Sequence, residues 1–291
     1  MEIVDAQIHE PTPPIPLDDR FGDEVKNLVN VEIAREAMDA VGVDVALVFA
    51  RQAYMDACVE RYPDRFGGAL TFDYMAEDLE EQVKNYRSRP GMLAGRNLVG
   101  NAFDATLRPE FNEGKFERLY TYAEKYDLPL FFSTHGWAHV MESVAQQHPG
   151  LTMVIDHLGV SQSPVSPPRP EPWDKLPGLL GLARYANVYV KFSGVPLMSK
   201  EPFPYQDTWP YLHQIVNAFG PDRLVWGTDF TRMRWVPQST KLAPRDQWRL
   251  YSDCVNYLRD TNELSQSDKE KMFGGTIRRI LRWPKVEAKT P

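Results

Sequence analysis

The chain has 291 residues and a formal net charge of −7, and 43% of its residues are hydrophobic and 25% charged. This balance is typical of a globular domain with a sizeable core, and the acidic charge argues against a nucleic-acid partner. Two cysteines exclude a disulfide framework, and no apolar run approaches the roughly 20 residues that span a bilayer. No signal-peptide pattern begins the chain. We therefore expect a cytoplasmic protein that binds a small molecule, without a membrane partner, and homo-oligomers are compatible with the sequence.

Hydrophobic runs of strand length alternate with amphipathic segments along the whole chain. Strands are expected at residues 2–9, 43–50, 65–73, 91–99, 128–134, 151–157, 187–193 and 223–229. Helices are expected at residues 31–41, 55–62, 77–87, 115–126, 138–147, 176–185 and 211–219, with two more near 246–259 and 267–281. Eight strand–helix units favour an α/β fold, a single-domain (β/α)8 TIM-type barrel over residues 1–291. A doubly wound open sheet is the structural alternative.

Two proline-containing segments follow strands and are expected to cover the barrel mouth, at about residues 10–30 and 160–178. The second contains SQSPVSPPRPEPWDKLPG, whose prolines suit the interior of neither a helix nor a strand. It directly follows a strand end, so we interpret it as a loop over the mouth rather than as an interdomain linker. The C-terminal helices, at about residues 246–282, complete the single domain.

Four titratable side chains stand at the far ends of expected strands: His9, His135, His157 and Asp229. In a TIM barrel these strand ends meet at one mouth, and the alternation of side chains predicts that Gln7 points the same way as His9. Imidazoles and a carboxylate can hold zinc or another divalent ion with an open position for water. The same set can also work without a metal, with Asp229 as the general base.

Further residues near the strand ends are candidates for substrate contacts. Arg96 ends the fourth expected strand and Arg232 follows the eighth, and a planar guanidinium suits a substrate carboxylate or a salt bridge at the rim. Trp173 lies in the second expected mouth loop, where it can wall a ring-shaped substrate or pack the loop. The chain has no G-x-S-x-G, H-E-x-x-H, Walker or G-x-G-x-x-G motif. These absences give no support to serine-hydrolase, NTPase or dinucleotide-dependent functions, and no organic cofactor is expected.

Five motifs, in this order, resemble the amidohydrolase superfamily: VDAQIHE, RPGMLAGRN, VIDHLGV, VYVKFSG and LVWGTDFTR. More narrowly they resemble the branch that includes 2-pyrone-4,6-dicarboxylate lactonase and the sugar lactonases, over nearly the whole chain. The resemblance implies that Asp229 is the proton shuttle and that His157 is the family's sixth-strand histidine. It also places His135 at a fifth-strand metal-ligand position, and Arg96 at the position of an arginine that contacts substrate carboxylates in the lactonases.

The chain departs from the family in the first-strand H-x-H motif, whose first histidine is Gln7. An amide oxygen is a poorer zinc ligand than an imidazole, and no lysine ends the fourth strand to be carbamylated and bridge two metals. A binuclear centre is therefore not expected. The resemblance implies either a mononuclear site for zinc or manganese, from His9, His135 and Asp229, or a metal-free site.

The sequence predicts a hydrolase that opens a small, carboxylated lactone with water activated by an aspartate. The predicted catalytic residues are Asp229, His157, His9 and His135. The predicted substrate contacts are Arg96, Gln7, Arg232 and Trp173. The alternative is a non-oxidative decarboxylase that acts on an aromatic or conjugated acid with a mononuclear metal. A third hypothesis is a catalytically silent barrel that only binds a ligand.

Overall fold

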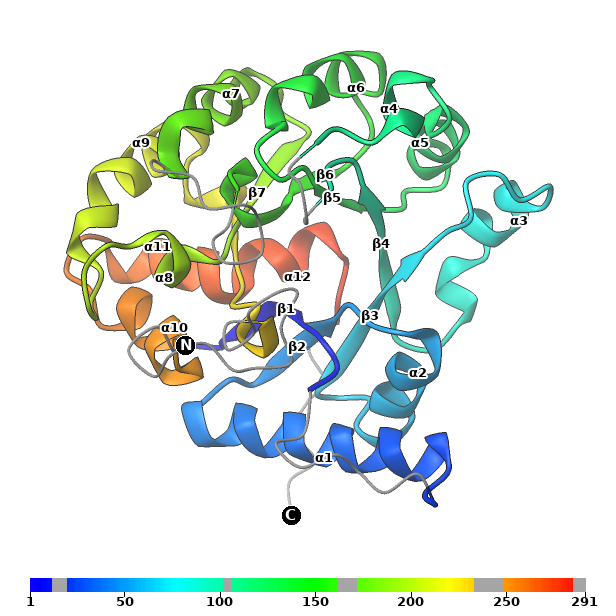
Figure 1. Ribbon diagram of the computed structural model, residues 1–291, viewed down its shortest axis with the longest axis horizontal. Helices are drawn as coiled ribbons and strands as arrows, with labels where there is room; N and C mark the ends of the chain where they lie inside the picture. Colours follow the sequence, from blue (N-terminus) through cyan, green and yellow to red (C-terminus); the bar gives the residue numbers. More distant parts are fainter. Residues whose placement is uncertain (12–19, 102–105, 162–171, 233–248, 285–291) are drawn as a thin grey trace.

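Eight parallel strands form one sheet in which each strand pairs with the next along the chain. The computed structural model describes residues 1–11, 20–101, 106–161, 172–232 and 249–284. The strands curl around a common axis with the helices outside them (Figure 1), which confirms the predicted TIM-type barrel. They are β1 (Val4–Ile8), β2 (Val45–Val48), β3 (Phe66–Thr71), β4 (Met92–Leu98), β5 (Leu130–Ser133), β6 (Met153–Ile155), β7 (Val188–Phe192) and β8 (Leu224–Trp226).

The α-helices of the described ranges follow the expected alternation with the strands. They are α1 (Asp23–Val41), α2 (Gln52–Arg61), α3 (Leu79–Lys84), α4 (Pro109–Asn112), α5 (Glu117–Lys125), α6 (Met141–Gln147), α7 (Leu176–Leu180), α8 (Val195–Met198), α9 (Trp209–Phe219), α10 (Tyr251–Arg259), α11 (Gln266–Glu270) and α12 (Thr276–Ile280). None of these helices has the length and apolar content that a membrane crossing requires.

The predicted boundaries of three segments need correction. Helix α1 begins at Asp23, so residues 23–30 of the first expected mouth loop are helical. Asn27 and Asn30 lie on the buried face of this helix, and these polar residues hide the apolar periodicity there. The second expected loop ends in helical turns, η4 (Pro172–Lys175) and α7, while residues 162–171 lie outside the described ranges. The last expected helix is α11 and α12 joined by a π-helical turn, η10 (Lys271–Gly275).

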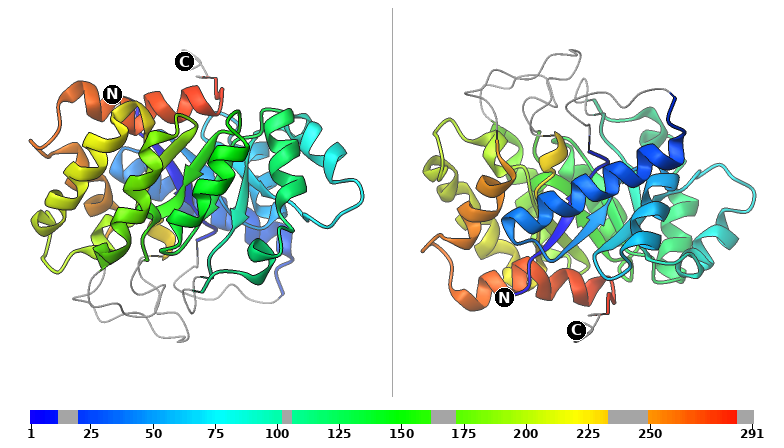
Figure 2. Two further views of the ribbon diagram at one scale, coloured as in Figure 1. Left: turned by 90° about the horizontal axis from the view of Figure 1, so that it is seen from above. Right: turned by 90° about the horizontal axis from the view of Figure 1, so that it is seen from below.

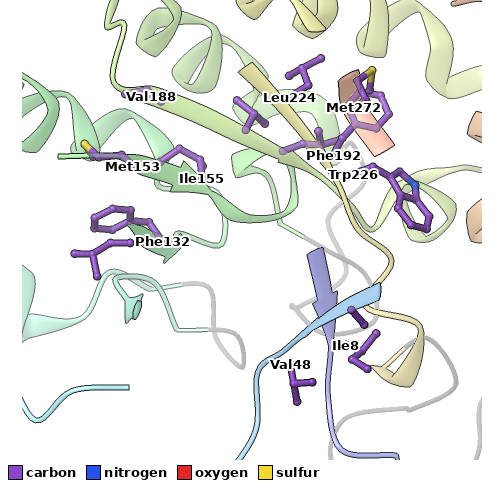
Figure 3. Packing of buried hydrophobic residues seen from close by; sticks show 14 of the residues in the cluster. Ile8, Val48, Phe132, Met153, Ile155, Val188, Phe192, Leu224, Trp226 and Met272 are labelled. Atoms are coloured by element: carbon purple, nitrogen blue, oxygen red, sulfur yellow. The ribbon is translucent and has the colours of Figure 1, made fainter. Parts of the chain in front are cut away.

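The core has two layers, one inside the barrel and one between the strands and the helices. Inward-facing residues such as Leu47, Phe131 and Val154 form the inner cluster, which Ile277 of α12 joins. Helix α12 and the N-terminal residues lie at the same end of the barrel (Figure 2). The outer layer contains the buried residues of Figure 3, among them Trp226. The carboxyl ends of the strands therefore lie at the opposite end of the barrel from α12, where the mouth is expected.

The barrel closes between β1 and β8 through a buried carboxylate. The backbone nitrogen of Thr228 donates to Asp5 Oδ1 at 2.8 Å and the phenol of Tyr251 donates to Asp5 Oδ2 at 3.0 Å. One backbone hydrogen bond, from Asp229 N to Gln7 O at 2.9 Å, crosses the same seam. Burial raises the pKa of Asp5 to about 6. Asp5 is thus a structural carboxylate, and the seam it closes holds Gln7 beside Asp229.

Candidate active site

All four predicted strand-end residues lie at the same end of the barrel and are buried. His9 follows β1, His135 follows β5, His157 lies in the turn η3 (Asp156–Gly159) after β6, and Asp229 follows β8. Their exposed fractions are 7%, 9%, 5% and 4%. The backbones of His135, His157 and Asp229 are left-handed, with φ of 46°, 53° and 60°. This conformation is uncommon for residues other than glycine, and it turns the chain sharply where each strand ends.

Gln7, His9, His157 and Asp229 converge through their polar side-chain atoms. His9 Nε2 lies 3.0 Å from Asp229 Oδ1, and His157 Nε2 lies 3.9 Å from Asp229 Oδ2. Gln7 Nε2 is 2.9 Å from His9 Nε2 and 3.5 Å from His157 Nε2. The structure therefore brings together residues that are up to 222 positions apart in the chain.

A register shift lets Gln7 join this group. The pairing of β1 with β2 shifts between Asp5 and Ile8, a local irregularity that can re-aim a side chain at the end of a strand. His9 is then fixed by two contacts: its Nδ1 bonds the carbonyl oxygen of Phe49, and its backbone nitrogen donates to Thr231 Oγ1 at 3.0 Å. The predicted common direction of Gln7 and His9 is confirmed by their direct contact.

His135 stands somewhat apart from the other three. Its Nε2 lies 2.9 Å from Ser133 Oγ, and its backbone carbonyl accepts a hydrogen bond from Ser161 Oγ at 3.0 Å. No interaction within hydrogen-bonding distance joins its ring to Asp229 among the described contacts. Burial, together with the nearby charge of Arg96, lowers the pKa of His135 to about 4.

His157 is also held in the neutral form at ordinary pH. Burial lowers the pKa of His157 to about 3, although the negative charges of Asp229 and Asp156 oppose the change. Its Nδ1 lies 2.9 Å from Ser193 Oγ, just after β7. At pH 7 His135 and His157 therefore act as neutral hydrogen-bonding groups and not as cations.

The sequence reasoning missed a buried ion pair beneath the site. Lys191 Nζ lies 2.6 Å from Asp156 Oδ1, and both side chains are fully buried. Burial alone would raise the pKa of Asp156, but the positive charge of Lys191, with His157 and Arg96, holds it below its usual range. Burial lowers the pKa of Lys191, and Asp156 opposes that change. The available signal was a lysine inside the otherwise apolar strand VYVKF.

The three remaining predicted substrate contacts differ in their placement. Arg96 projects from β4 and is 19% exposed, with Nε 3.9 Å from Asp156 Oδ2 and its guanidinium over the Phe49 ring. The ring of Trp173 instead stacks on Tyr211 of α9 at a centroid distance of 4.7 Å. The ring thus packs against α9, and its contact with a substrate stays a prediction. Arg232 ends the short turn η8 (Phe230–Arg232), and its side chain lies outside the described part of the chain.

A TIM-type barrel that gathers histidines and an aspartate from β1, β5, β6 and β8 has the architecture of the amidohydrolase class. Residues 4–283 match the amidohydrolase family, and the chain belongs to it. The family resemblance inferred from the five motifs is thereby confirmed.

Two curated relatives are lactone hydrolases. The chain is 27% identical over 161 residues to the 4-sulfomuconolactone hydrolase of Hydrogenophaga intermedia, covering 53% of this chain and 48% of the relative. It is 34% identical over 89 residues to the L-fucono-1,5-lactonase of Burkholderia ambifaria, covering 30% of this chain and 28% of the relative. The chain thus spans half or less of the length of each. These similarities support the lactonase-like branch of the family.

Solved structures with the same fold cover the chain almost completely. An amidohydrolase from Burkholderia multivorans with bound zinc superposes with a TM-score of 0.71 at 17% identity, over 98% of this chain and 100% of the other. The 5-carboxyvanillate decarboxylase of Novosphingobium aromaticivorans, complexed with manganese, gives a TM-score of 0.63 at 14% identity, over 97% and 96%. At these identities the likeness concerns the fold, and related folds hold divalent metals.

The donor set of this chain fits a divalent ion poorly. In the described ranges, no three histidine, cysteine, aspartate or glutamate side chains are grouped as a metal cluster. The amide of Gln7 presents its nitrogen, and not its oxygen, to His9 and His157. An amide N–H is a hydrogen-bond donor and cannot ligate a cation.

Proposed function

We propose that the protein is a hydrolase that opens the ester ring of a small, carboxylated lactone. The observation that carries the proposal is the buried Asp229 carboxylate, 3.0 Å from His9 Nε2, among neutral imidazoles at the strand ends of an amidohydrolase barrel. The similarity to two lactone hydrolases supports the substrate class.

Asp229 is placed to activate water. In the proposed reaction its carboxylate takes a proton from water while the water oxygen forms a bond to the lactone carbonyl carbon. The tetrahedral intermediate then collapses, the ring C–O bond breaks, and the proton passes from Asp229 to the departing alkoxide. The product is a hydroxy acid. His9 and His157 line the carboxylate and fix its position in the pocket.

Arg96 would hold the substrate carboxylate. Its side chain comes from β4 and is partly exposed, whereas Asp156 and Lys191 beneath it are fully buried. A guanidinium can meet a carboxylate with two parallel hydrogen bonds. This contact would orient the lactone so that its carbonyl carbon faces the water bound at Asp229.

The test is steady-state hydrolysis of a panel of carboxylated and uncharged lactones, followed by acid release with a pH indicator. Asp229→Asn should lower kcat by about 10²- to 10⁴-fold, the usual contribution of a general base, with KM nearly unchanged. Asp222→Asn is the matched control, because Asp222 is an exposed aspartate that pairs with Lys271 away from the site. Near-wild-type turnover by Asp229→Asn would refute the mechanism. Release of carbon dioxide from an aromatic acid, without lactone hydrolysis, would instead favour the decarboxylase alternative.

A further inference from the structure

Lys191 is a buried cation directly beneath the site. Its ammonium is enclosed by acceptors: Asp156 Oδ1 at 2.6 Å, Gln7 Oε1, and the faces of the Phe49 and Phe131 rings at 4.6 and 4.9 Å from their centroids. Aromatic faces and carboxylates both attract positive charge. Each of these four contacts therefore stabilises the charged form of Lys191 inside the barrel.

The contact with Lys191 fixes the orientation of the Gln7 amide. An ammonium only donates hydrogen bonds, so the amide atom that faces it is the oxygen. The amide nitrogen must then face the opposite way, toward His9 Nε2 at 2.9 Å and His157 Nε2 at 3.5 Å. Because that nitrogen also only donates, it faces an acceptor lone pair at His157 Nε2, whereas His9 Nε2 also lies 3.0 Å from Asp229 Oδ1, a carboxylate oxygen that only accepts.

The opposite ring nitrogens of the two histidines agree with this assignment. His9 Nδ1 meets the carbonyl oxygen of Phe49, which can only accept, so Nδ1 carries the hydrogen. His157 Nδ1 lies 2.9 Å from the hydroxyl of Ser193, which can accept a hydrogen bond from it. Both histidines thus carry a hydrogen on Nδ1, and His157 is a neutral ring with its lone pair on Nε2.

This arrangement has a consequence for cations. His9 Nε2 and His157 Nε2, the atoms that a metal ion would need as ligands, face the amide hydrogens of Gln7. A positive charge also lies immediately behind the amide, and it repels a second cation in a buried environment of low dielectric constant.

We propose that Lys191, acting through Gln7, takes the place of a divalent metal ion in this chain. Lys191 is a positioning residue: it orients Gln7, whose amide nitrogen faces His9 Nε2 and His157 Nε2 beside Asp229, and it supplies the buried positive charge. The role of this group beside Asp229 as the base rests on the proposed lactone hydrolysis. The exclusion of a metal ion does not rest on that proposed reaction.

Metal content provides the first test. Wild type, Gln7→His, Lys191→Met, the double variant and the control Lys269→Met are stripped with chelator, incubated with zinc or manganese, desalted and measured by mass spectrometry. Lys269 is a buried lysine on α11, away from the site, that bonds backbone carbonyls. Wild type and Lys269→Met should retain almost no metal. The double variant should bind zinc more than about 100-fold more tightly than wild type in competition with a chromogenic chelator. Wild type that retains about one metal per chain, as a single mononuclear site would, overturns the proposal.

A second measurement needs no variant and covers the case in which Lys191→Met does not fold. In protein labelled with ¹⁵N-histidine, long-range ¹⁵N–¹H spectra distinguish the two neutral ring forms. His157 should carry its hydrogen on Nδ1 and none on Nε2 at pH 7, with the assignment from His157→Gln. A hydrogen on His157 Nε2 overturns the proposal. Absence of lactone turnover with both results as expected would refute the proposed function and leave this inference standing.

Discussion

Acidification from pH 7 to pH 5 is expected to destabilise the fold, because two buried imidazoles remain neutral in the native protein. The pKa of His135 is lowered to about 4 and that of His157 to about 3, from an ordinary value of 6.5. Below pH 6.5 the unfolded chain therefore binds more protons than the native one. The contribution of these two neutral rings to the free energy of unfolding is fully present above pH 6.5 and is lost as the pH falls toward 4.

The size of the effect follows from these values. Each tenfold difference in acidity corresponds to about 1.4 kcal/mol, so at pH 5 each histidine costs about 2 kcal/mol of unfolding free energy. Asp5 acts in the opposite direction. Its pKa is raised from 3.8 to about 6, so its burial is unfavourable above pH 6 and about 1.3 kcal/mol is recovered at pH 5. The net loss between pH 7 and pH 5 is therefore about 2 to 3 kcal/mol.

Urea unfolding followed by tryptophan fluorescence at pH 7, 6 and 5 measures this loss. His157→Gln should reduce the pH dependence by about 2 kcal/mol, because one of the two titrating rings is gone. His213→Gln, which replaces an exposed histidine paired with Glu263, should leave it unchanged. Equal stability of the wild type at pH 7 and pH 5 would refute the reasoning.

Three further predictions concern the core, the thiols and the pocket. Phe132→Ala should lower the free energy of unfolding by about 3 to 5 kcal/mol in the same urea assay, since Phe132 is fully buried; a loss under about 1 kcal/mol would contradict its core role. Burial raises the pKa of Cys58 to about 12, so the native protein at pH 8 should not react with a disulfide reagent within minutes, whereas urea-unfolded protein should. Arg96→Met should raise KM roughly 10- to 100-fold for carboxylated lactones, the value of a charged hydrogen bond, and leave KM for uncharged lactones unchanged. An equal effect on both substrate sets would exclude its carboxylate contact.

The fold and the convergence of His9, His157 and Asp229 were predictable because they depend on local patterns. Apolar runs with a titratable residue at each end identify parallel strands and the mouth that they share. The ion pair of Lys191 with Asp156 was not predictable in the same way. Lys191 lies on β7 and Asp156 lies in the turn η3 after β6, and a lysine in an apolar strand does not reveal from sequence which carboxylate it contacts.

The start of α1 and the stacking of Trp173 on Tyr211 were not predictable for a related reason. Asn27 and Asn30 are buried by contacts with the rest of the barrel, and no local periodicity indicates this. Trp173 follows a proline-rich segment near the mouth, and only the tertiary structure shows its ring stacked on Tyr211. In both cases packing between distant segments outweighs local propensity.

The left-handed backbones of His135, His157 and Asp229 imply a conflict between stability and function at the mouth. Each such residue costs on the order of 1 kcal/mol or more relative to glycine, which adopts positive φ freely. Glycine at any of these three positions would relieve the backbone but remove the side chain that the pocket presents. Selection of this protein for thermal stability alone should therefore replace these residues first, and selection for turnover should retain them.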